Sequence, residues 1–272
     1  MIGKIGVFDS GLGGLTILKE MIGRMPDREY VYLGDNLNTP YGNKSQEEIF
    51  RLTSAGVEWL FGQGAEIIVL ACNTASANAL RRIQQEILPQ KYPEKRVLGI
   101  IIPTVEEADK FSQAGHVGIL ATRATVASGV FEAEMKKRNP TIQVVCQSGG
   151  DLAELIERDA KDGSLEEEIT RVVERLIAED DQIDTLVLGC THYALIADKI
   201  ADFLAGKVKI VTQGQLVAEK LDDYLERHSE IREKLSRESK VNFYTTSEDE
   251  QVKKLMIRFY GEKVSVETVK ID

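Results

Sequence analysis

Ten short apolar runs, rich in valine and isoleucine, alternate along this chain of 272 residues with longer stretches of helical hydrophobic spacing. Runs that are apolar at nearly every position are typical of strands buried on both faces, as in parallel sheets. Strands that alternate with helices predict an α/β fold in which helices cover the sheets. Ten strands are many for one sheet, so we expect two domains. The runs occupy residues 5–8, 30–33, 67–70, 97–101, 117–120, 142–145, 185–189, 208–211, 241–244 and 264–269.

Polar residues mark where two of the helical stretches begin. Ser45 with Glu48, and Ser164 with Glu167, have the spacing of capping boxes, in which the serine side chain accepts a backbone N–H of the first turn. We therefore expect these serines to cap two helices. The stretch after the first run has its apolar residues on one helical face, at Leu15, Leu18, Ile22 and Met25.

Charge and cysteine content exclude several classes of function. The chain has 44 acidic and 34 basic residues, and its net charge of −10 disfavours nonspecific binding to nucleic acid or to anionic membranes. No apolar run approaches the ~20 residues of a membrane span, and no signal peptide precedes the first run. The three separated cysteines, Cys72, Cys146 and Cys190, fit neither a disulfide framework nor a CxxC zinc site. We expect free thiols in the cytoplasm.

Two of the cysteines lie in matching contexts. VLACNT (69–74) and VLGCTH (187–192) each combine a buried strand, a small residue, a cysteine and polar residues that open a helix. A lone cysteine is usually a small buried apolar residue, and Cys146 is assigned that role. Because a helix N-terminus lowers the pKa of a thiol, Cys72 and Cys190 are expected to exchange protons. Two such thiols on opposite sides of a substrate carbon, at the carboxyl ends of strands, could invert its configuration.

Residues near the two cysteine motifs each have a structural and a functional interpretation. Asp9 and Ser10, in VFDSGLGG (7–14), either cap a helix at a glycine-rich turn or support proton transfer by Cys72. The turn lacks the final glycine of a dinucleotide site and the GK[ST] of a phosphate loop, so neither cofactor is expected there. His192 is either a surface cap or a partner of the second thiol. Without HExxH or CxxC, a metal site is disfavoured.

Other polar residues are structural by default. PYG (40–42) is typical of a turn, Thr122 and Thr125 follow a strand as a helix cap would, and Glu154 fits a helix surface. Their residue types alone assign them no further role.

Several strings resemble the glutamate racemase family. They are VFDSGLGGLT (7–16), LGD with PYG (33–42), VLACNTAS (69–76), GILATRATVAS (118–128), LGCTHY (188–193) and the TTS…FYG tail near 245–261. The first string and the two cysteine motifs are specific in combination, and the resemblance extends over nearly the whole chain. It implies an α/β fold of two pseudo-symmetric parallel-sheet domains with the active site in the cleft between them. Residues 1–98 and 209–272 would form the first domain and residues 99–208 the second.

The resemblance also implies a reaction. The chain would be an isomerase that interconverts L- and D-glutamate without pyridoxal phosphate, metal or nucleotide, in the cytoplasm, and supplies D-glutamate for peptidoglycan, the cell wall and cell shape. Cys72 and Cys190 match the two catalytic thiols, and Asp9 and His192 match auxiliary groups that also bind the substrate. The only implied partner is the small-molecule substrate, and a homodimer is a state that the resemblance allows. The remaining positions that match substrate-binding residues are Ser10, Tyr41, Gly42, Asn73, Thr74, Thr122, Thr125, Glu154 and Thr191.

The sequence departs from the family pattern at a few positions. Ala194 stands where the family often has proline, and residues 36–38 (Asn-Leu-Asn) replace a Thr-Ala-Arg-like run. Gln213 stands in a Ser-Gly-like turn, and Glu248 stands where glycine is common. None of these positions is a matched thiol, so we expect them to affect the rim of the cleft, turn geometry and regulation rather than the reaction.

Alternative functions stay open on the residues alone. Within the superfamily that the motifs resemble, the alternative is an aspartate or hydantoin racemase. A Cys-His thiol hydrolase leaves the second cysteine motif unexplained, and a noncatalytic amino-acid-binding protein needs neither thiol. Because the glycine-rich, PYG and cysteine motifs contain no lysine or arginine, we expect backbone amides and hydroxyls to bind the substrate charges, with Arg123 pointing away. We also expect no activation by a muramyl precursor through an N-terminal extension.

Overall fold

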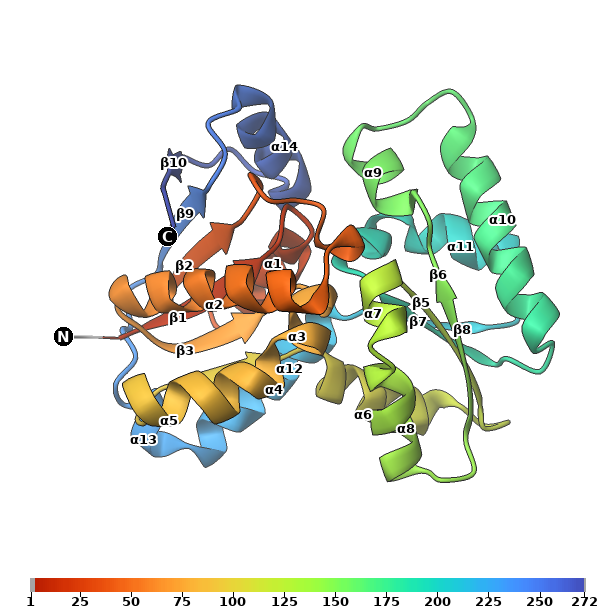
Figure 1. The fold of residues 1–272 in the computed structure, drawn as a ribbon, viewed down its shortest axis with the longest axis horizontal. Coiled ribbons are helices and arrows are strands. Elements are labelled where there is room, and N and C mark those ends of the chain that lie inside the picture. Colours follow the sequence, from red (N-terminus) through yellow and green to blue (C-terminus); the bar gives the residue numbers. More distant parts are fainter. Residues whose placement is uncertain (1–2, 272) are drawn as a thin grey trace.

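The computed structural model describes residues 3–271 and arranges ten strands in two separate sheets (Figure 1). The first sheet has the order β10-β9-β2-β1-β3-β4, and the second has the order β6-β5-β7-β8. Each predicted run overlaps one strand and every pairing between strands is parallel, so the predicted α/β fold with two parallel-sheet domains is confirmed. The strands are β1 (Lys4–Asp9), β2 (Glu29–Gly34), β3 (Ala65–Leu70), β4 (Arg96–Gly99), β5 (His116–Ala121), β6 (Gln143–Ser148), β7 (Thr185–Gly189), β8 (Lys209–Val211), β9 (Lys240–Thr245) and β10 (Val266–Thr268).

Helices connect the strands, as the alternating pattern predicted. Two short 3-10 helices and one π-helical turn interrupt the α-helical series. The helical segments are α1 (Gly14–Arg24), η1 (Tyr41–Asn43), α2 (Gln46–Gly62), α3 (Asn73–Asn78), α4 (Leu80–Arg82), η2 (Ile83–Ile87), α5 (Leu88–Lys91), α6 (Ile101–Phe111), α7 (Arg123–Ala127), α8 (Val130–Arg138), α9 (Leu152–Glu157), α10 (Ser164–Glu179), η3 (Thr191–Ile196), α11 (Ala197–Phe203), α12 (Gly214–Arg227), α13 (Ser229–Arg232) and α14 (Glu250–Tyr260).

One of the two predicted serine caps is present. Ser45 caps α2, where its side-chain oxygen accepts a hydrogen bond from the backbone N–H of Glu48 at 3.3 Å. The predicted cap at Ser164 is wrong, because its hydroxyl donates to Asp162 at 2.5 Å instead. Gly163 precedes α10 with a φ of 86°, a conformation that glycine adopts without steric cost.

The two sheets repeat one strand order. The segment β2-β1-β3-β4 of the first sheet corresponds to the whole second sheet, β6-β5-β7-β8, so that β3 and β7 occupy equivalent places. Cys72 follows β3, and Cys190 follows β7. The similarity between the two cysteine motifs therefore coincides with a repeat in the fold.

The chain crosses between the sheets twice, from β4 into α6 and from β8 into α12. Because β8 pairs with β7, residues 209–211 lie in the second sheet, and a boundary drawn by sheet membership falls after 211 rather than at 208. The division of the chain into domains at the predicted boundaries stays a prediction.

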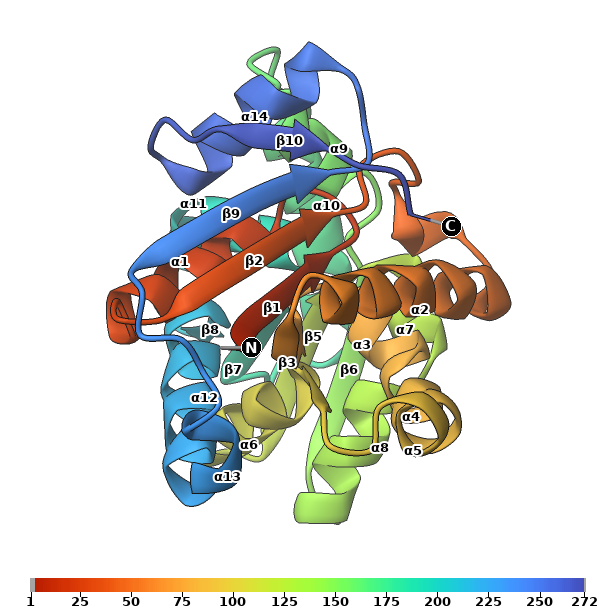
Figure 2. The same cartoon turned by 90° about the vertical axis from the view of Figure 1, so that its left-hand side faces the viewer.

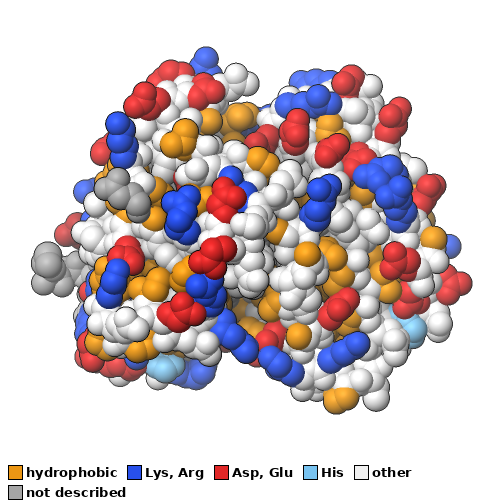
Figure 3. Space-filling model, in the orientation of Figure 1, with side chains coloured by type: hydrophobic (Ala, Val, Ile, Leu, Met, Phe, Trp, Pro, Cys, Tyr) orange, Lys and Arg blue, Asp and Glu red, His pale blue; other side chains and the backbone are white. Residues whose placement is uncertain are grey.

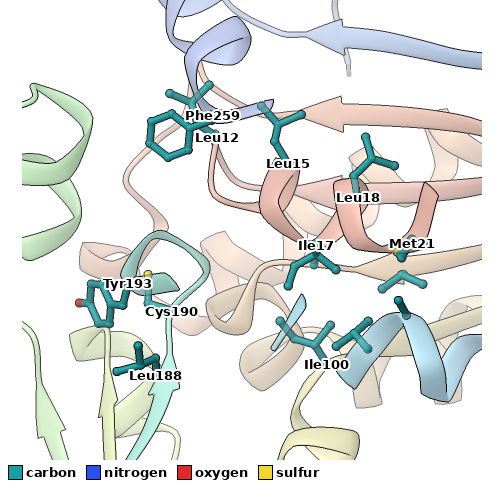
Figure 4. Close-up of a cluster of buried hydrophobic side chains, with 14 of the residues drawn as sticks. Leu12, Leu15, Ile17, Leu18, Met21, Ile100, Leu188, Cys190, Tyr193 and Phe259 are labelled. Carbon is teal, nitrogen blue, oxygen red and sulfur yellow. The ribbon is translucent and has the colours of Figure 1, made fainter. Parts of the chain in front are cut away.

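A single apolar cluster contacts both sheets. It contains the buried face of α1, including Leu15, Leu18 and Met21, together with Leu188 of β7. Figure 4 shows these side chains with Ile100, Tyr193 and Cys190 in one view. Each fully buried aliphatic side chain of this kind contributes about 1.5–3 kcal/mol to folding. The cluster therefore fixes the second cysteine loop relative to the helix that follows the glycine-rich turn.

The strands of the first sheet lie side by side and point in one direction (Figure 2). Their carboxyl ends meet at one edge, which is where open α/β sheets bind ligands. On the face drawn in Figure 3, acidic and basic side chains are interspersed rather than gathered into one basic patch. No helix within residues 3–271 has both the length and the apolar composition that crossing a bilayer requires.

Candidate active site

A cavity of about 200 Å³ contains both cysteines and is lined from both sheets. Its lining comes from the segments that follow β1, β2, β3, β5 and β7, and from α9. Of the predicted site residues, Asp9 and Thr125 lie outside the lining and all others are in it. The lining residues are Ser10, Thr39, Pro40, Tyr41, Gly42, Cys72, Asn73, Thr74, Thr122, Ala153, Glu154, Glu157, Cys190, Thr191 and His192.

Cys72 lies between β3 and α3, with its Sγ atom 3.2 Å from the hydroxyl oxygen of Ser10. The same Sγ accepts a hydrogen bond from the backbone N–H of Ala75 at 3.4 Å. Burial raises the pKa of Cys72 to about 12, and the charge of Asp9 adds to this, while the two hydrogen bonds lower it. The predicted lowering of this pKa is wrong, because desolvation of the thiolate outweighs the N-terminus of the six-residue helix α3. At neutral pH, Cys72 is therefore a thiol and a proton donor.

Asp9, at the end of β1, lies behind the cavity lining rather than in it. Its Oδ1 accepts a hydrogen bond from the backbone N–H of Gly11 at 2.8 Å, so this amide is not free to bind a substrate carboxylate. Its buried Oδ2 has no hydrogen-bond partner among residues 3–271. Burial raises the pKa of Asp9, against the lowering effects of His192 and of backbone hydrogen bonds. Within the same described residues Asp9 makes no hydrogen bond to Cys72, so its predicted support of this thiol stays a prediction.

The glycine-rich turn lets α1 approach the second cysteine loop. A Cβ atom placed on Gly13 would lie 2.1 Å from Oγ1 of Thr191 and 2.6 Å from Nδ1 of His192. Real Cβ atoms do not approach other atoms so closely, so any side chain at position 13 would push the two loops apart. Gly13, in the glycine-rich turn that was compared with a dinucleotide site, thus allows close packing at the cavity wall.

Cys190 and His192 lie together in the segment that follows β7 of the second sheet. Sγ of Cys190 is 3.8 Å from Nδ1 of His192, and Nε2 of His192 is 2.7 Å from Oε1 of Glu157. Burial lowers the pKa of His192, but the hydrogen bonds and charges of Cys190 and Glu157 outweigh burial and raise the pKa to about 10. His192 therefore carries a proton at neutral pH. It is buried, which excludes the alternative that it is a surface cap.

Three threonine hydroxyls form a cluster where α3 meets α7. Oγ1 of Thr122 is 2.9 Å from Oγ1 of both Thr74 and Thr125, and the last two are 3.3 Å apart. Thr122 also caps α7, because its side chain accepts the backbone N–H of Thr125. Thr74 and Thr122 line the cavity, whereas Thr125 lies behind them and orients their hydroxyls.

The PYG motif leads into η1, which packs against α7. A Cβ atom on Gly42 would lie 3.0 Å from Cβ of Thr122, so this glycine allows close contact between the loops. The Tyr41 hydroxyl donates to the buried carboxylate of Asp35 at 2.6 Å, and Asn38 donates to the same carboxylate at 3.0 Å. One residue of the divergent 36–38 run thus helps to hold the loop that presents Tyr41 to the cavity.

Sequence reasoning missed Glu157, the acidic partner of His192. The available signal was its position three residues after Glu154, on the same face of the predicted helix. Both glutamates are in α9 and line the cavity, but only Glu157 is hydrogen-bonded to His192. Thr39, Pro40 and Ala153 were missed as well, and nothing in their residue types distinguishes them from ordinary loop and helix residues.

The cavity lining contains polar and acidic side chains but, within residues 3–271, no lysine or arginine. Arg123 is exposed and lies outside the lining. In the same part of the chain, no group of three or more His, Cys, Asp or Glu side chains is arranged to hold a metal ion. The protonated His192 is therefore the cationic side chain of the cavity wall.

Comparison with known proteins adds independent evidence. The chain is 40% identical over 275 residues to a glutamate racemase from Paracoccus denitrificans (strain Pd 1222), covering 97% of this chain and 99% of that protein. Its fold is similar to glutamate racemase isoform RacE1 from Bacillus anthracis, with a TM-score of 0.89 and 31% identity over 98% of this chain and 97% of that one. It is also similar to a glutamate racemase from Francisella tularensis solved with D-glutamate, with a TM-score of 0.87 and 28% identity over 100% of this chain and 98% of that one.

The family model described as Asp/Glu/Hydantoin racemase matches residues 15–221, which is more than half of the chain. This match and the near full-length relatives confirm the resemblance predicted from the motifs, and they identify an amino-acid racemase. With its two cysteine loops at equivalent ends of two parallel sheets, this chain belongs to the Asp/Glu/Hydantoin racemase family.

Proposed function

We propose that this enzyme interconverts L- and D-glutamate without a cofactor, with Cys72 and Cys190 as opposed acid/base groups. The observation that carries the proposal is that both thiols line one cavity, each presented by an equivalent strand of a different sheet. The choice of glutamate is supported by relatives named glutamate racemase and by a similar structure solved with D-glutamate. We further propose that the reaction takes place in the cytoplasm and supplies D-glutamate for peptidoglycan.

Inversion requires that one proton leaves and another arrives on the opposite face. One thiolate removes the α-proton and becomes a thiol, and the electron pair stays on the α-carbon. The opposite thiol then donates its proton to the other face and becomes a thiolate. Following the family resemblance, Cys190 with His192 takes the proton from L-glutamate, and Cys72 with Asp9 takes it from D-glutamate. Exchange with solvent restores the starting protonation.

In this proposal, groups of the cavity lining bind the charged groups of the substrate. A net charge of −10 opposes long-range attraction of an anion, so binding depends on these local contacts. The hydroxyl and amide groups of Ser10, Asn73, Thr74 and Thr191 are donors for the two carboxylates. Both N–H groups of the protonated His192 are paired with Cys190 and Glu157, so His192 contributes its positive charge rather than a hydrogen bond. The substrate ammonium would bind an acidic group, and Glu154 is a cavity-lining carboxylate without a hydrogen-bond partner among residues 3–271.

The experiment that tests the two-base mechanism is racemisation in D₂O, followed by NMR of the α-position. D-glutamate formed from L-glutamate should carry deuterium from its first appearance, while the remaining L-glutamate stays protonated early in the reaction. The reason is that the donating thiol has exchanged with solvent and is not the thiol that took the substrate proton. Early D-glutamate that retains the substrate's own proton would contradict two opposed bases.

Variants complete this test. Cys72→Ala and Cys190→Ala should each lower kcat/KM by at least ~10²–10⁴-fold, the usual contribution of a general acid or base. Cys146→Ala is the matched control, since Cys146 lies in β6 outside the cavity lining. The Cys190, His192 and Glu157 arrangement also resembles the nucleophile, base and orienting acid of a thiol hydrolase. Normal turnover by Cys72→Ala, with an acyl-enzyme on Cys190 found by mass spectrometry, would favour that alternative.

A further inference from the structure

A buried chain of hydrogen bonds extends from the crossings between the sheets to the cavity wall. Gln213, in the divergent turn after β8, forms a two-way pair with Asn73, the residue that follows Cys72. Nδ2 of Asn73 donates to Oε1 of Gln213 at 2.6 Å, and Nε2 of Gln213 donates to Oδ1 of Asn73 at 2.9 Å. Nε2 of Gln213 also donates to Oγ1 of Thr104 in α6, at 2.8 Å. Asn73, Thr104 and Gln213 are at most 2% exposed.

The single hydroxyl proton of Thr104 determines which groups donate and which accept in this series of hydrogen bonds. Thr104 donates that proton to the backbone oxygen of Ile100 at 2.6 Å, so toward Gln213 it can only accept. The atom of Gln213 that faces Thr104 must therefore be nitrogen, and the atom that completes the pair with Nδ2 of Asn73 must be oxygen. An amide at this position could otherwise adopt either of two flipped orientations, since its own shape does not distinguish oxygen from nitrogen.

The orientation of Asn73 decides what it presents to the cavity. Both hydrogens of the Gln213 amide are used, but only one hydrogen of the Asn73 amide has an acceptor within residues 3–271. Asn73 lines the cavity. In the observed orientation it has an N–H to offer there. In the flipped orientation it would place an oxygen there, and that oxygen would repel a carboxylate.

We propose that Gln213 and Thr104 are positioning residues that hold the Asn73 amide with an N–H free for a substrate carboxylate. This inference rests on the proposed racemisation of glutamate for its substrate, but the hydrogen-bond order exists independently of it. Thr104 lies just after the first crossing between the sheets, and Gln213 lies just after the second. The pair therefore ties a substrate-binding amide to both segments that connect the two halves of the molecule.

The order of the hydrogen bonds can be tested by NMR of side-chain amide protons, without substrate. In the wild type, both Gln213 amide protons and one Asn73 amide proton should exchange slowly with solvent, and the second Asn73 proton should exchange faster. In Thr104→Val, one Gln213 proton loses its acceptor and should exchange faster. Equal protection of the two Asn73 protons in the wild type would overturn the assigned orientation.

Kinetics test what the orientation does. Gln213→Met keeps the side-chain length and removes both hydrogen bonds to Asn73, and it should raise KM for glutamate ~10- to 100-fold, the effect expected for a hydrogen bond to a charged group. Thr104→Val allows both orientations of the Gln213 amide and hence of the Asn73 amide. It should raise KM at least ~2-fold, because only the molecules with the observed Asn73 orientation are competent to bind glutamate. In both variants kcat should change less than KM. Thr104→Ser restores the hydroxyl and should restore the wild-type KM.

The matched control is Thr53→Val, which removes the hydroxyl of a fully buried threonine whose Oγ1 has no hydrogen-bond partner within the described residues. It should leave KM unchanged. A wild-type KM in Thr104→Val and Gln213→Met, or an equal loss in Thr104→Ser, would overturn the positioning role. If the wild type shows the expected proton protection but does not racemise glutamate, the proposed function fails and the assigned orientation stands.

Discussion

Replacing Glu157 by glutamine should lower the pKa of His192 without removing their hydrogen bond. Oε1 of Glu157 lies 2.7 Å from Nε2 of His192, and a glutamine oxygen at the same position can still accept the N–H. The change removes only the negative charge. It therefore isolates the electrostatic part of the interaction that helps to raise the His192 pKa to about 10.

The magnitude follows from the geometry of the pair. Two unit charges ~4 Å apart attract by about 4 kcal/mol at an effective dielectric constant near 20. The Glu157 side chain is 27% exposed, so solvent screening reduces this value, and about 2 kcal/mol agrees with hydrogen bonds to charged groups. Because 1.36 kcal/mol corresponds to one pKa unit, the His192 pKa should fall from about 10 to about 8.5.

The effect on stability depends on pH in a defined direction. The pKa of His192 in the folded protein lies above its ordinary value near 6.5. Protonation of His192 therefore stabilises the fold fully below about pH 6.5, and this stabilisation is lost as the pH rises through about 10. Glu157→Gln should therefore lower the free energy of unfolding by about 2 kcal/mol near pH 7. The difference should disappear as pH rises through about 10, where both proteins have lost the proton.

Two measurements check this prediction. NMR titration of the imidazole signals gives the His192 pKa directly, and urea unfolding at several pH values gives the stability difference. Glu154→Gln is the matched control, because it removes a charge from the same helix, whereas the hydrogen bond to His192 comes from Glu157. An unchanged His192 pKa in Glu157→Gln, or a stability difference that persists above pH 10, would refute the reasoning.

Dialysis against a chelator should leave racemisation unchanged, because no step of the proposal uses a metal; activity that is lost and then restored by a metal ion would contradict this. Arg123→Ala should leave KM unchanged, since Arg123 is exposed and outside the cavity lining; a KM raised by orders of magnitude would reveal an Arg–carboxylate contact. Tyr41→Phe should lower the free energy of unfolding by about 1–3 kcal/mol in urea titrations, because it removes a donor from the buried carboxylate of Asp35; unchanged stability would show that other donors replace the hydroxyl.

The interior strands were predictable from the sequence because burial on both faces leaves a run of apolar residues in each of them. The run at 67–70 is apolar throughout, the run at 185–189 is apolar at 186–188, and both form interior strands of their sheets. Because Cys72 and Cys190 come just after these two runs, their position at the carboxyl ends of strands could also be predicted. A local capping signal was less reliable: Ser45 caps its helix, whereas the hydroxyl of Ser164 binds Asp162 instead.

Features that depend on distant pairs were not predictable. Gln213 and Asn73 are 140 residues apart in the chain, and either residue alone is typical of a turn or a helix start. The raised pKa of Cys72 was missed for a related reason. The helix N-terminus that lowers a thiol pKa is visible in the sequence, whereas the burial that outweighs it depends on packing around the cavity.

The two cysteines occupy equivalent places in the repeated strand order but have unlike surroundings. Cys72 is next to a serine hydroxyl and a backbone N–H, and burial raises its pKa to about 12, so it holds a proton at neutral pH. Cys190 is next to His192, whose own pKa is raised to about 10 and which therefore also carries a proton. Opposed proton transfer requires that one thiol is protonated while the other is not. The repeated fold therefore supplies two equivalent positions, and in the proposed two-base inversion the difference between the two thiols comes from the side chains around them.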